Sequence, residues 1–316
     1  MGSSFALILE DPKILSDLCG AQDENIKALE KILEVPIYIR GNQITLDSQD
    51  EETRRHFKVL MELLADQAEG GCSLTPDTIR VFHDSLKDPE SGAAERIKSA
   101  YIQIPSGPRI KPRTYPQAAY IQGMKSRELV FSIGPGGTGK TFLAVAHALQ
   151  EILEKRKKKL VLTRPVVEAG ENLGFLPGDL SQKLNPYLRP LYDAMDRLIP
   201  AEMIQRMEEN RVIELAPLAY MRGRSLENAY IILDEAQNTT REQMKMFLTR
   251  MGEGSRMVVT GDITQIDLPD KSHSGLVQVR DLLKPLDEIG FYYFTSKDVI
   301  RHPLVRKIIE IYEKNK

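Results

Sequence analysis

The chain has 316 residues, of which 41% are hydrophobic and 28% are charged, a balance typical of soluble globular proteins with about two domains. No apolar run approaches the ~20 residues that a membrane-spanning helix requires, and the N-terminus lacks the basic region of a secretory signal. The two cysteines, Cys19 and Cys72, have no His or Cys cluster near them. We therefore expect reduced thiols, no metal site at these positions and a cytoplasmic protein.

The charge is unevenly distributed along the chain. Residues 1–85 contain 8 basic and 16 acidic residues, a balance of −8, although the whole chain carries only −2. The remaining residues therefore carry a balance of +6. Because Lys and Arg attract a phosphate backbone, this distribution favours a nucleic-acid contact in the second part of the chain.

Residues 1–84 are predicted to form a small α+β domain. A strand at 3–10 is followed by a helix that Asp11 caps and Pro12 starts, and then by a second amphipathic helix. The sequence VPIYIRGNQITL predicts two strands joined by a Gly41-Asn42 turn. A long helix is expected to start near Asp50, and one more helix is expected at 74–84.

This order of elements resembles a KH domain, which clamps nucleotides with a Gly-x-x-Gly loop between two adjacent helices. The corresponding loop is Gly20-Ala21-Gln22-Asp23, so an aspartate stands where the second glycine would be. A carboxylate at that position repels phosphate. We interpret the KH-like domain as a surface for protein contact or scaffolding, with RNA binding by this loop as the alternative.

Residues 85–115 are rich in Pro, Gly and charge, and we interpret them as a linker. From 116 to 316, short β-branched runs alternate with helical patterns. This alternation predicts an α/β domain with a parallel sheet and helices on both faces, and the motif GPGGTGKT within it indicates a P-loop NTPase fold. The six predicted strands lie in the sequences ELVFSI, KLVLTRP, RVIELAP, AYIILDE, RMVVTGD and GFYYFT.

A complete P-loop, GPGGTGKT, follows the first of these strands and opens a helix. Its glycines allow successive backbone N–H groups to point into one concavity that holds phosphates, and the helix N-terminus adds partial positive charge. Lys140 is expected to reach the β- and γ-phosphates of ATP, and the Thr141 hydroxyl is expected to bind Mg²⁺. The expected nucleotide-binding residues of the loop are Gly134, Pro135, Gly136, Gly137, Thr138, Gly139, Lys140 and Thr141.

Two adjacent carboxylates, Asp234 and Glu235, follow the apolar strand AYIIL at the edge of the sheet where ligands bind. We expect Asp234 to hold Mg²⁺ through water and Glu235 to act as general base on the attacking water. Gln265, after the strand RMVVTGD, is expected to contact the γ-phosphate, with a plain helix-capping turn as the alternative. Gln117, upstream of the P-loop, is expected to pair with adenine, as a carboxamide does in DNA recognition.

Taken together, Gln117, GPGGTGKT, LDEAQN and TGDITQID resemble the first RecA-like lobe of superfamily 1 helicases. The segments TRPVVEAGENLGFLPGDL and DVIRHPLV make the chain more similar to the PhoH family of cytosolic bacterial ATPases, over about residues 105–315. The resemblance implies Mg²⁺-dependent ATP hydrolysis, with γ-phosphate sensing by Gln237 or Gln265. It also implies a role in RNA metabolism, with an endoribonuclease partner that acts in ribosomal RNA maturation. We recognise no PIN nuclease domain, which some relatives carry.

Only 51 residues follow Gln265, whereas a second RecA-like lobe needs well over about 100. We therefore expect a homo-oligomeric ring, in which an arginine from a neighbouring subunit completes each ATP site. Arg301 is the first candidate for this arginine. Arg306, Arg222 and Arg224 are further candidates, and an ordinary surface position is the alternative for each.

Residues 164–190 begin at the catalytic end of a predicted β-strand. In helicase lobes, a segment at this position runs along the backbone of the bound nucleic acid. Side chains that combine charge with one stacking ring suit a single-stranded RNA contact, and the candidates are Arg164, Lys183, Tyr187 and Arg189. Packing between subunits is the alternative use of this segment. We interpret the basic run KRKKK at 155–159 as a solvated helix C-terminus, where cations complement the helix dipole.

Two functions follow from these observations. The first is a Mg²⁺-dependent ATPase that acts in RNA processing or remodelling as a ring. The second is an ATP-switched interaction module for an endoribonuclease partner, without unwinding activity. A small-molecule kinase is disfavoured because we recognise no acceptor pocket or lid motif.

Overall fold

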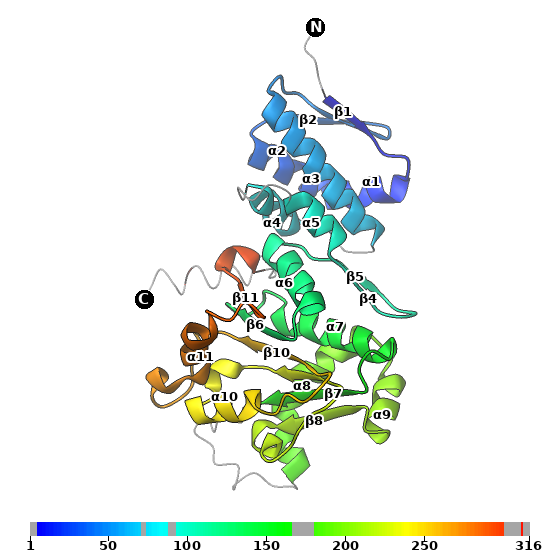
Figure 1. Ribbon diagram of the computed structural model, residues 1–316. Coiled ribbons are helices and arrows are strands. Elements are labelled where there is room, and N and C mark those ends of the chain that lie inside the picture. The colour runs from blue at the N-terminus through cyan, green and yellow to red at the C-terminus, as the bar shows by residue number, and fades with distance from the viewer. Residues whose placement is uncertain (1–4, 71–73, 88–92, 166–179, 300–310, 312–316) are drawn as a thin grey trace. The chain divides into compact units, whose positions relative to one another are not determined.

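The computed structural model (Figure 1) describes residues 5–70, 74–87, 93–165, 180–299 and 311, with the backbone alone for 180–187. The chain divides into two compact units. The first contains Met1–Tyr101, Lys111–Ala118 and Ile300–Lys316, and the second contains Ile102–Ile110 and Ala119–Val299.

The first unit is a small α+β fold with an antiparallel sheet in the order β1-β3-β2. Its strands are β1 (Phe5–Ile8), β2 (Ile37–Arg40) and β3 (Gln43–Leu46). Its main helices are α1 (Pro12–Cys19), α2 (Glu24–Leu33), α3 (Glu51–Glu69) and α4 (Pro76–Leu86). The predicted order of strand, helix, helix, strand, strand and helix is therefore confirmed.

Local capping and one apolar face explain these elements. The Asp50 carboxylate accepts a hydrogen bond of 2.7 Å from the backbone N–H of Thr53 and so satisfies a free donor at the start of α3. Further along α3, Phe57, Leu60 and Leu64 recur at helical spacing and are fully buried. The ring of Phe57 also packs edge-on against Phe5 of β1, so the apolar face of α3 is turned toward the sheet.

The segment 85–115, which we interpret as a linker, contains regular structure. It includes the helix α5 (Ala93–Ser99) and a hairpin of β4 (Ile102–Gln103) with β5 (Arg109–Ile110). Ile97 and Ile102 in these elements are buried. The sequence did not predict these elements, because each is short and contains few apolar positions among Pro, Gly and charged residues.

The second unit contains a six-stranded sheet in the order β11-β6-β10-β9-β7-β8, and every pair of neighbouring strands is parallel. The strands are β6 (Leu129–Ile133), β7 (Lys159–Arg164), β8 (Ile213–Pro217), β9 (Ala229–Leu233), β10 (Arg256–Gly261) and β11 (Ile289–Tyr293). The helices are α6 (Tyr115–Ser126), which begins in the first unit, α7 (Lys140–Leu153), α8 (Leu180–Asp196), α9 (Ala201–Glu209), α10 (Arg241–Leu248) and α11 (Gly275–Leu283). All six predicted strands are present.

Helices cover both faces of this sheet, as predicted. On one face Ile231 of β9 belongs to a core cluster with Phe247 of α10 and Leu276 of α11. On the other face the hydroxyl of Tyr230 lies 2.8 Å from Nδ1 of His147 on α7. Because both faces are covered, the strands are almost continuously apolar.

The strand order decides which loops meet at the carboxyl edge of the sheet. In the parallel register Gly261 of β10 lies beside Ile133 of β6, and Val259 lies beside Leu233 of β9. The P-loop after β6, the carboxylates after β9 and the turn after β10 therefore converge on the same edge, where ligands of parallel sheets bind.

Candidate functional site

The P-loop forms a tight turn between β6 and α7. Gly134, Gly137 and Gly139 have φ angles of 156°, 84° and 82°, which L side chains rarely adopt. A Cβ on Gly134 would lie only 2.5 Å from the carbonyl oxygen of Phe294, so no side chain fits there. The Gly134 N–H donates to the carbonyl oxygen of Gly261, 3.1 Å away, which attaches the loop to the neighbouring strand β10.

Lys140, the first residue of α7, is directed back into the loop. Its Nζ donates to the carbonyl oxygens of Gly134 and Pro135, at 2.7 and 2.8 Å, and only 7% of the residue is exposed. Burial lowers the pKa of its amino group, while nearby carboxylates, Asp262 first, act in the opposite direction. The lysine therefore offers a partly desolvated cation at the centre of the P-loop.

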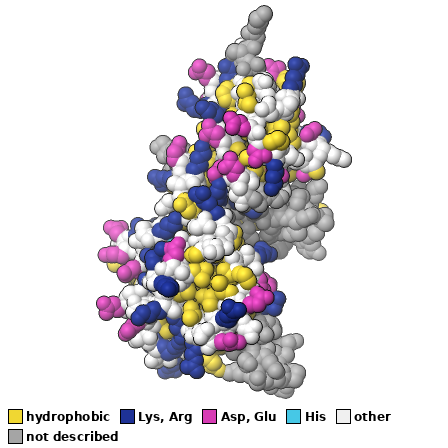
Figure 2. Space-filling view, turned by 90° about the vertical axis from the view of Figure 1, so that its right-hand side faces the viewer, with side chains coloured by type: hydrophobic (Ala, Val, Ile, Leu, Met, Phe, Trp, Pro, Cys, Tyr) yellow, Lys and Arg dark blue, Asp and Glu magenta, His cyan; other side chains and the backbone are white. Residues whose placement is uncertain are grey.

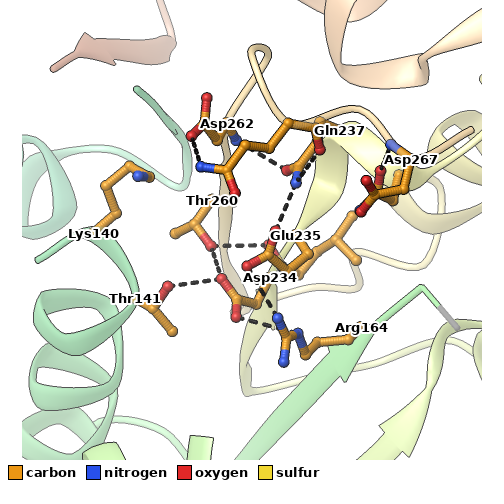
Figure 3. A network of polar contacts seen from close by, with 12 residues as sticks. Lys140, Thr141, Arg164, Asp234, Glu235, Gln237, Thr260, Asp262 and Asp267 are labelled. Carbon is orange, nitrogen blue, oxygen red and sulfur yellow. Dashed lines mark hydrogen bonds and ion pairs between the residues drawn. The ribbon is translucent and has the colours of Figure 1, made fainter. Parts of the chain in front are cut away.

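Asp234, directly after β9, is held by two hydroxyl groups. Its Oδ1 accepts hydrogen bonds from Thr141 at 2.7 Å and from Thr260 at 2.6 Å, and 4% of the residue is exposed (Figure 3). Thr260 was not among the predicted site residues. It reaches Asp234 because β10 lies between β6 and β9, an arrangement that the chain order does not reveal.

Arg164, the last residue of β7, faces both carboxylates. Its Nε lies 3.4 Å from Oδ2 of Asp234, and its Nη2 lies 3.0 Å from Oε1 of Glu235 (Figure 3). The side chain is 16% exposed. We expected Arg164 among the RNA contacts, but these ion pairs direct its guanidinium into the candidate site instead.

Glu235 and three polar neighbours form a continuous hydrogen-bond network. Glu235 has a φ of 54°, and its Oε2 accepts a hydrogen bond of 2.6 Å from Nε2 of Gln237. Oε1 of Gln237 accepts from the backbone N–H of Asp262 at 2.9 Å, and Nε2 of Gln265 donates to Oδ2 of Asp262 at 2.6 Å. Gln237 therefore joins the carboxylate after β9 to the turn after β10.

The P-loop, the two carboxylates and the turn after β10 line one cavity of about 290 Å³. It is lined by Gly136, Gly137, Gly139, Lys140, Thr141, Phe142, Asp234, Glu235, Gly261, Asp262 and Gln265. The cavity thus brings together P-loop glycines, a cation, a hydroxyl group and carboxylates. Backbone donors and a lysine suit phosphate groups, and the paired oxygen donors of Thr141 and Asp234 suit a hard cation such as Mg²⁺.

The remaining predicted residues have other contacts in the structure or fall outside the described residues. Oε1 of Gln117 accepts a hydrogen bond of 2.7 Å from the backbone N–H of Arg113, within the first unit. Arg224 pairs with Glu214 at 2.6 Å, and Arg222 is exposed. Those outside the description are Arg301, Arg306 and the side chains of Lys183 and Tyr187.

The part of the chain that carries this cavity is similar to a known protein family. A model of the family described as PhoH-like protein matches residues 109–313, about two thirds of the chain. The chain belongs to the PhoH-like protein family. Membership in this family implies nucleotide binding, which agrees with the P-loop cavity, and it confirms the resemblance seen in the sequence motifs.

PhoH-like relatives match along most of the chain. The PhoH-like protein of Bacillus subtilis (strain 168) is 46% identical over 306 residues, which cover 97% of this chain and 96% of the relative. The PhoH-like protein of Mycobacterium tuberculosis (strain H37Rv) is 47% identical over 301 residues, covering 95% and 85%. Protein PhoH of Escherichia coli (strain K12) is 42% identical over 226 residues, covering 71% and 63%. The family relationship therefore extends over both units.

Solved structures of helicase and ATPase cores match more weakly. The Pyrococcus furiosus Hef helicase domain has a TM-score of 0.36 at 15% identity and covers 58% of this chain and 38% of that chain. The Sulfolobus solfataricus SWI2/SNF2 ATPase core in complex with dsDNA has a TM-score of 0.34 at 14% identity, covering 57% and 43%. The fold assignment rests on the strand order and P-loop of the chain itself. None of the described helices has the length and hydropathy for a membrane crossing.

Proposed function

We propose that this PhoH-like protein is a Mg²⁺-dependent ATP hydrolase that acts on RNA. The observation that carries the proposal is the single cavity that Lys140, Thr141, Asp234 and Glu235 line together. A P-loop by itself serves binding and transfer as well as hydrolysis. A second acid beside Asp234, at the rim of the same cavity, supplies the base that activation of water needs.

Each side chain has a distinct role in this proposal. When bound, Mg·ATP supplies the scissile γ-phosphoryl group and neutralises charge that develops on its oxygens. Lys140 and the P-loop N–H groups bind the phosphates, and Thr141 and Asp234 provide oxygen ligands for the cation. Glu235, held by Gln237, orients a water molecule and accepts its proton. Gln265 also lines the cavity, where its Nε2 donates a hydrogen bond to Oδ2 of Asp262.

The RNA part of the proposal rests on charge and position. Residues 86–316 carry a basic excess of +6. On the face seen in Figure 2, Lys and Arg side chains over the second unit are interspersed with Asp and Glu, so this face has no continuous basic patch. Lys183, Tyr187 and Arg189 stay our proposed RNA contacts. We also propose that, in a ring, an arginine from a neighbouring subunit completes each ATP site, with Arg301 as the first candidate.

A second candidate function is an ATP-switched module that holds an endoribonuclease partner. The loop after α1 favours it. Gly20 and Asp23 have φ angles of 72° and 59°, and the carboxylate of Asp23 is on an exposed residue. An exposed negative charge in place of the second loop glycine opposes a nucleotide backbone, while it suits a basic protein surface.

One experiment separates the two functions. Phosphate release from ATP is measured with and without single-stranded RNA, and the mass of the assembly is measured with ATP present. The first function predicts Mg²⁺-dependent turnover that RNA increases, in an assembly larger than one chain. Turnover that no RNA changes would remove the RNA part, and a monomer with full turnover would remove the ring.

A further inference from the structure

We propose that Arg164 is a built-in counter-cation that holds Asp234 while the site is free of metal, and that it competes with the divalent cation for this carboxylate. The inference rests on the proposed function, because it assigns the cation to Asp234. It concerns the pairing at the end of β7, where Thr163 lies beside Leu233 of β9 in the parallel register. This register places Arg164 next to the two residues that follow β9.

The charge balance of the site requires such a partner. Asp234 is almost fully buried, and a buried carboxylate is costly unless it is paired and hydrogen-bonded. Lys140 does not form this pair, because its Nζ is directed to the carbonyl oxygens of Gly134 and Pro135. Within the described part of the chain, Arg164 is the only cation that forms an ion pair with Asp234 or Glu235.

The two carboxylate oxygens of Asp234 are already engaged. Oδ1 accepts hydrogen bonds from Thr141 and Thr260, and Oδ2 faces Nε of Arg164. Thr141 keeps both hydroxyl lone pairs while it donates to Asp234, so this hydrogen bond can persist beside a bound cation. The contact that opposes the cation is the ion pair of Oδ2 with Arg164, because a divalent cation bound at Thr141 and Asp234 repels the nearby guanidinium. Metal binding and the Arg164–Asp234 pair therefore oppose each other.

Glu235 is affected by the same exchange. Its Oε1 faces Nη2 of Arg164, and its Oε2 accepts from Gln237. If Arg164 withdraws, Gln237 still fixes the carboxylate, and Oε1 becomes available to a water molecule. Arg164 thus acts as a positioning residue that keeps both carboxylates engaged until the cation arrives.

The test measures metal binding without nucleotide or turnover. Free Mn²⁺, used in place of Mg²⁺, is followed by electron paramagnetic resonance during titration of the full chain. The variants are Arg164→Gln, which removes the charge, and Arg164→Lys, which keeps it. Asp234→Asn identifies the binding that belongs to this site. Arg280→Gln on α11 is the matched control, since Arg280 pairs only with the adjacent Asp281 among the described residues.

We expect Arg164→Gln to tighten Mn²⁺ binding at this site roughly ten- to hundredfold, the effect of removing one cation at about 6 Å in a partly screened site. Arg164→Lys and Arg280→Gln should stay within about threefold of the wild type. Without metal, Arg164→Gln should also lower the midpoint of thermal unfolding, and Mn²⁺ should raise it more than in the wild type. A role in stability alone would lower the midpoint without tightening metal binding.

Equal or weaker Mn²⁺ binding by Arg164→Gln, including no binding by either protein, would overturn the proposal. This result differs from a failure of the proposed function, which would appear as absent ATP hydrolysis by the wild type. A chain that hydrolyses no ATP but binds Mn²⁺ more tightly after Arg164→Gln would retain the counter-cation and lose the ATPase assignment.

Discussion

Replacement of Glu235 by glutamine separates the chemistry of the site from its ability to bind nucleotide. The new carboxamide has nearly the same shape, and its oxygen can still accept the hydrogen bond from Gln237. What it loses is the proton acceptor and the ion pair with Arg164 at 3.0 Å. The Glu235 side chain is 42% exposed, so water screens this pair and its loss costs about 1 kcal/mol or less.

The catalytic effect should be much larger than this structural cost. A positioned general base contributes about 10²–10⁴ in rate, which is roughly 3–5 kcal/mol in the activation free energy. We therefore expect Glu235→Gln to reduce phosphate release from Mg·ATP by about 10²–10⁴. ATP affinity should change by only a few-fold, because Lys140 and the P-loop are untouched.

The assay combines phosphate release at saturating Mg·ATP with equilibrium binding of a fluorescent ATP analogue. Glu253→Gln is the matched control, since Glu253 is exposed in the loop before β10, at the opposite edge of the sheet. It should release phosphate at the wild-type rate. A loss below tenfold for Glu235→Gln, with binding intact, would refute the general-base role. An equal loss of binding and release would show that Glu235 shapes the site instead.

Three further predictions concern the structure around the site and the first unit. Gly134→Ala places a methyl group against the carbonyl oxygen of Phe294, so it should destabilise the chain by roughly 1–3 kcal/mol and weaken ATP binding, as thermal unfolding and ATP titration will measure. Thr260→Val removes a hydrogen bond to the buried Asp234 carboxylate, and it should lower stability by about 1.5–3 kcal/mol in the same unfolding assay. Burial and a neighbouring histidine lower the pKa of His83 to about 4, whereas the pKa of a histidine in the unfolded chain is about 6.5. The unfolded chain thus binds the proton first as the pH falls, so His83→Gln should reduce the loss of thermal stability between pH 6.5 and 4.

Each of these has a clear contrary result. An unchanged melting temperature and ATP affinity for Gly134→Ala would show that the loop relaxes around a side chain. Wild-type stability of Thr260→Val would mean that Thr141 and Arg164 are sufficient partners for the Asp234 carboxylate. Parallel pH profiles for the wild type and His83→Gln would show that other groups cause the acid sensitivity.

Sequence patterns predicted the second unit well because its strands are buried on both faces. A strand such as AYIIL, with five buried residues from Ala229 to Leu233, is recognisable as a continuous apolar run. The P-loop is equally clear, because its glycines and Lys140 stand at fixed spacing between a strand and a helix. These features depend on residues close together in the chain.

The site residues that the sequence did not reveal depend on strand order. Thr260 lies one residue before the end of β10, and Arg164 is the last residue of β7. Each contacts Asp234 only because β10 and β7 flank β9. A threonine or arginine at the end of a strand has no distinctive pattern. The sequence around Thr260 indicates only the turn that carries Gln265, and the sequence around Arg164 indicates only a candidate RNA contact. The inward direction of these two side chains depends on the tertiary fold.

The most direct test of the central claim compares phosphate release from ATP by the wild type and by Lys140→Ala, with Mg²⁺ and with a chelator. Lys140 is buried inside the P-loop and is the cation that lines the cavity. We predict release by the wild type that requires Mg²⁺ and that Lys140→Ala reduces to the background rate. Release that persists at the wild-type rate after Lys140→Ala, or that ignores the chelator, would contradict the assignment of this cavity as the site of ATP hydrolysis.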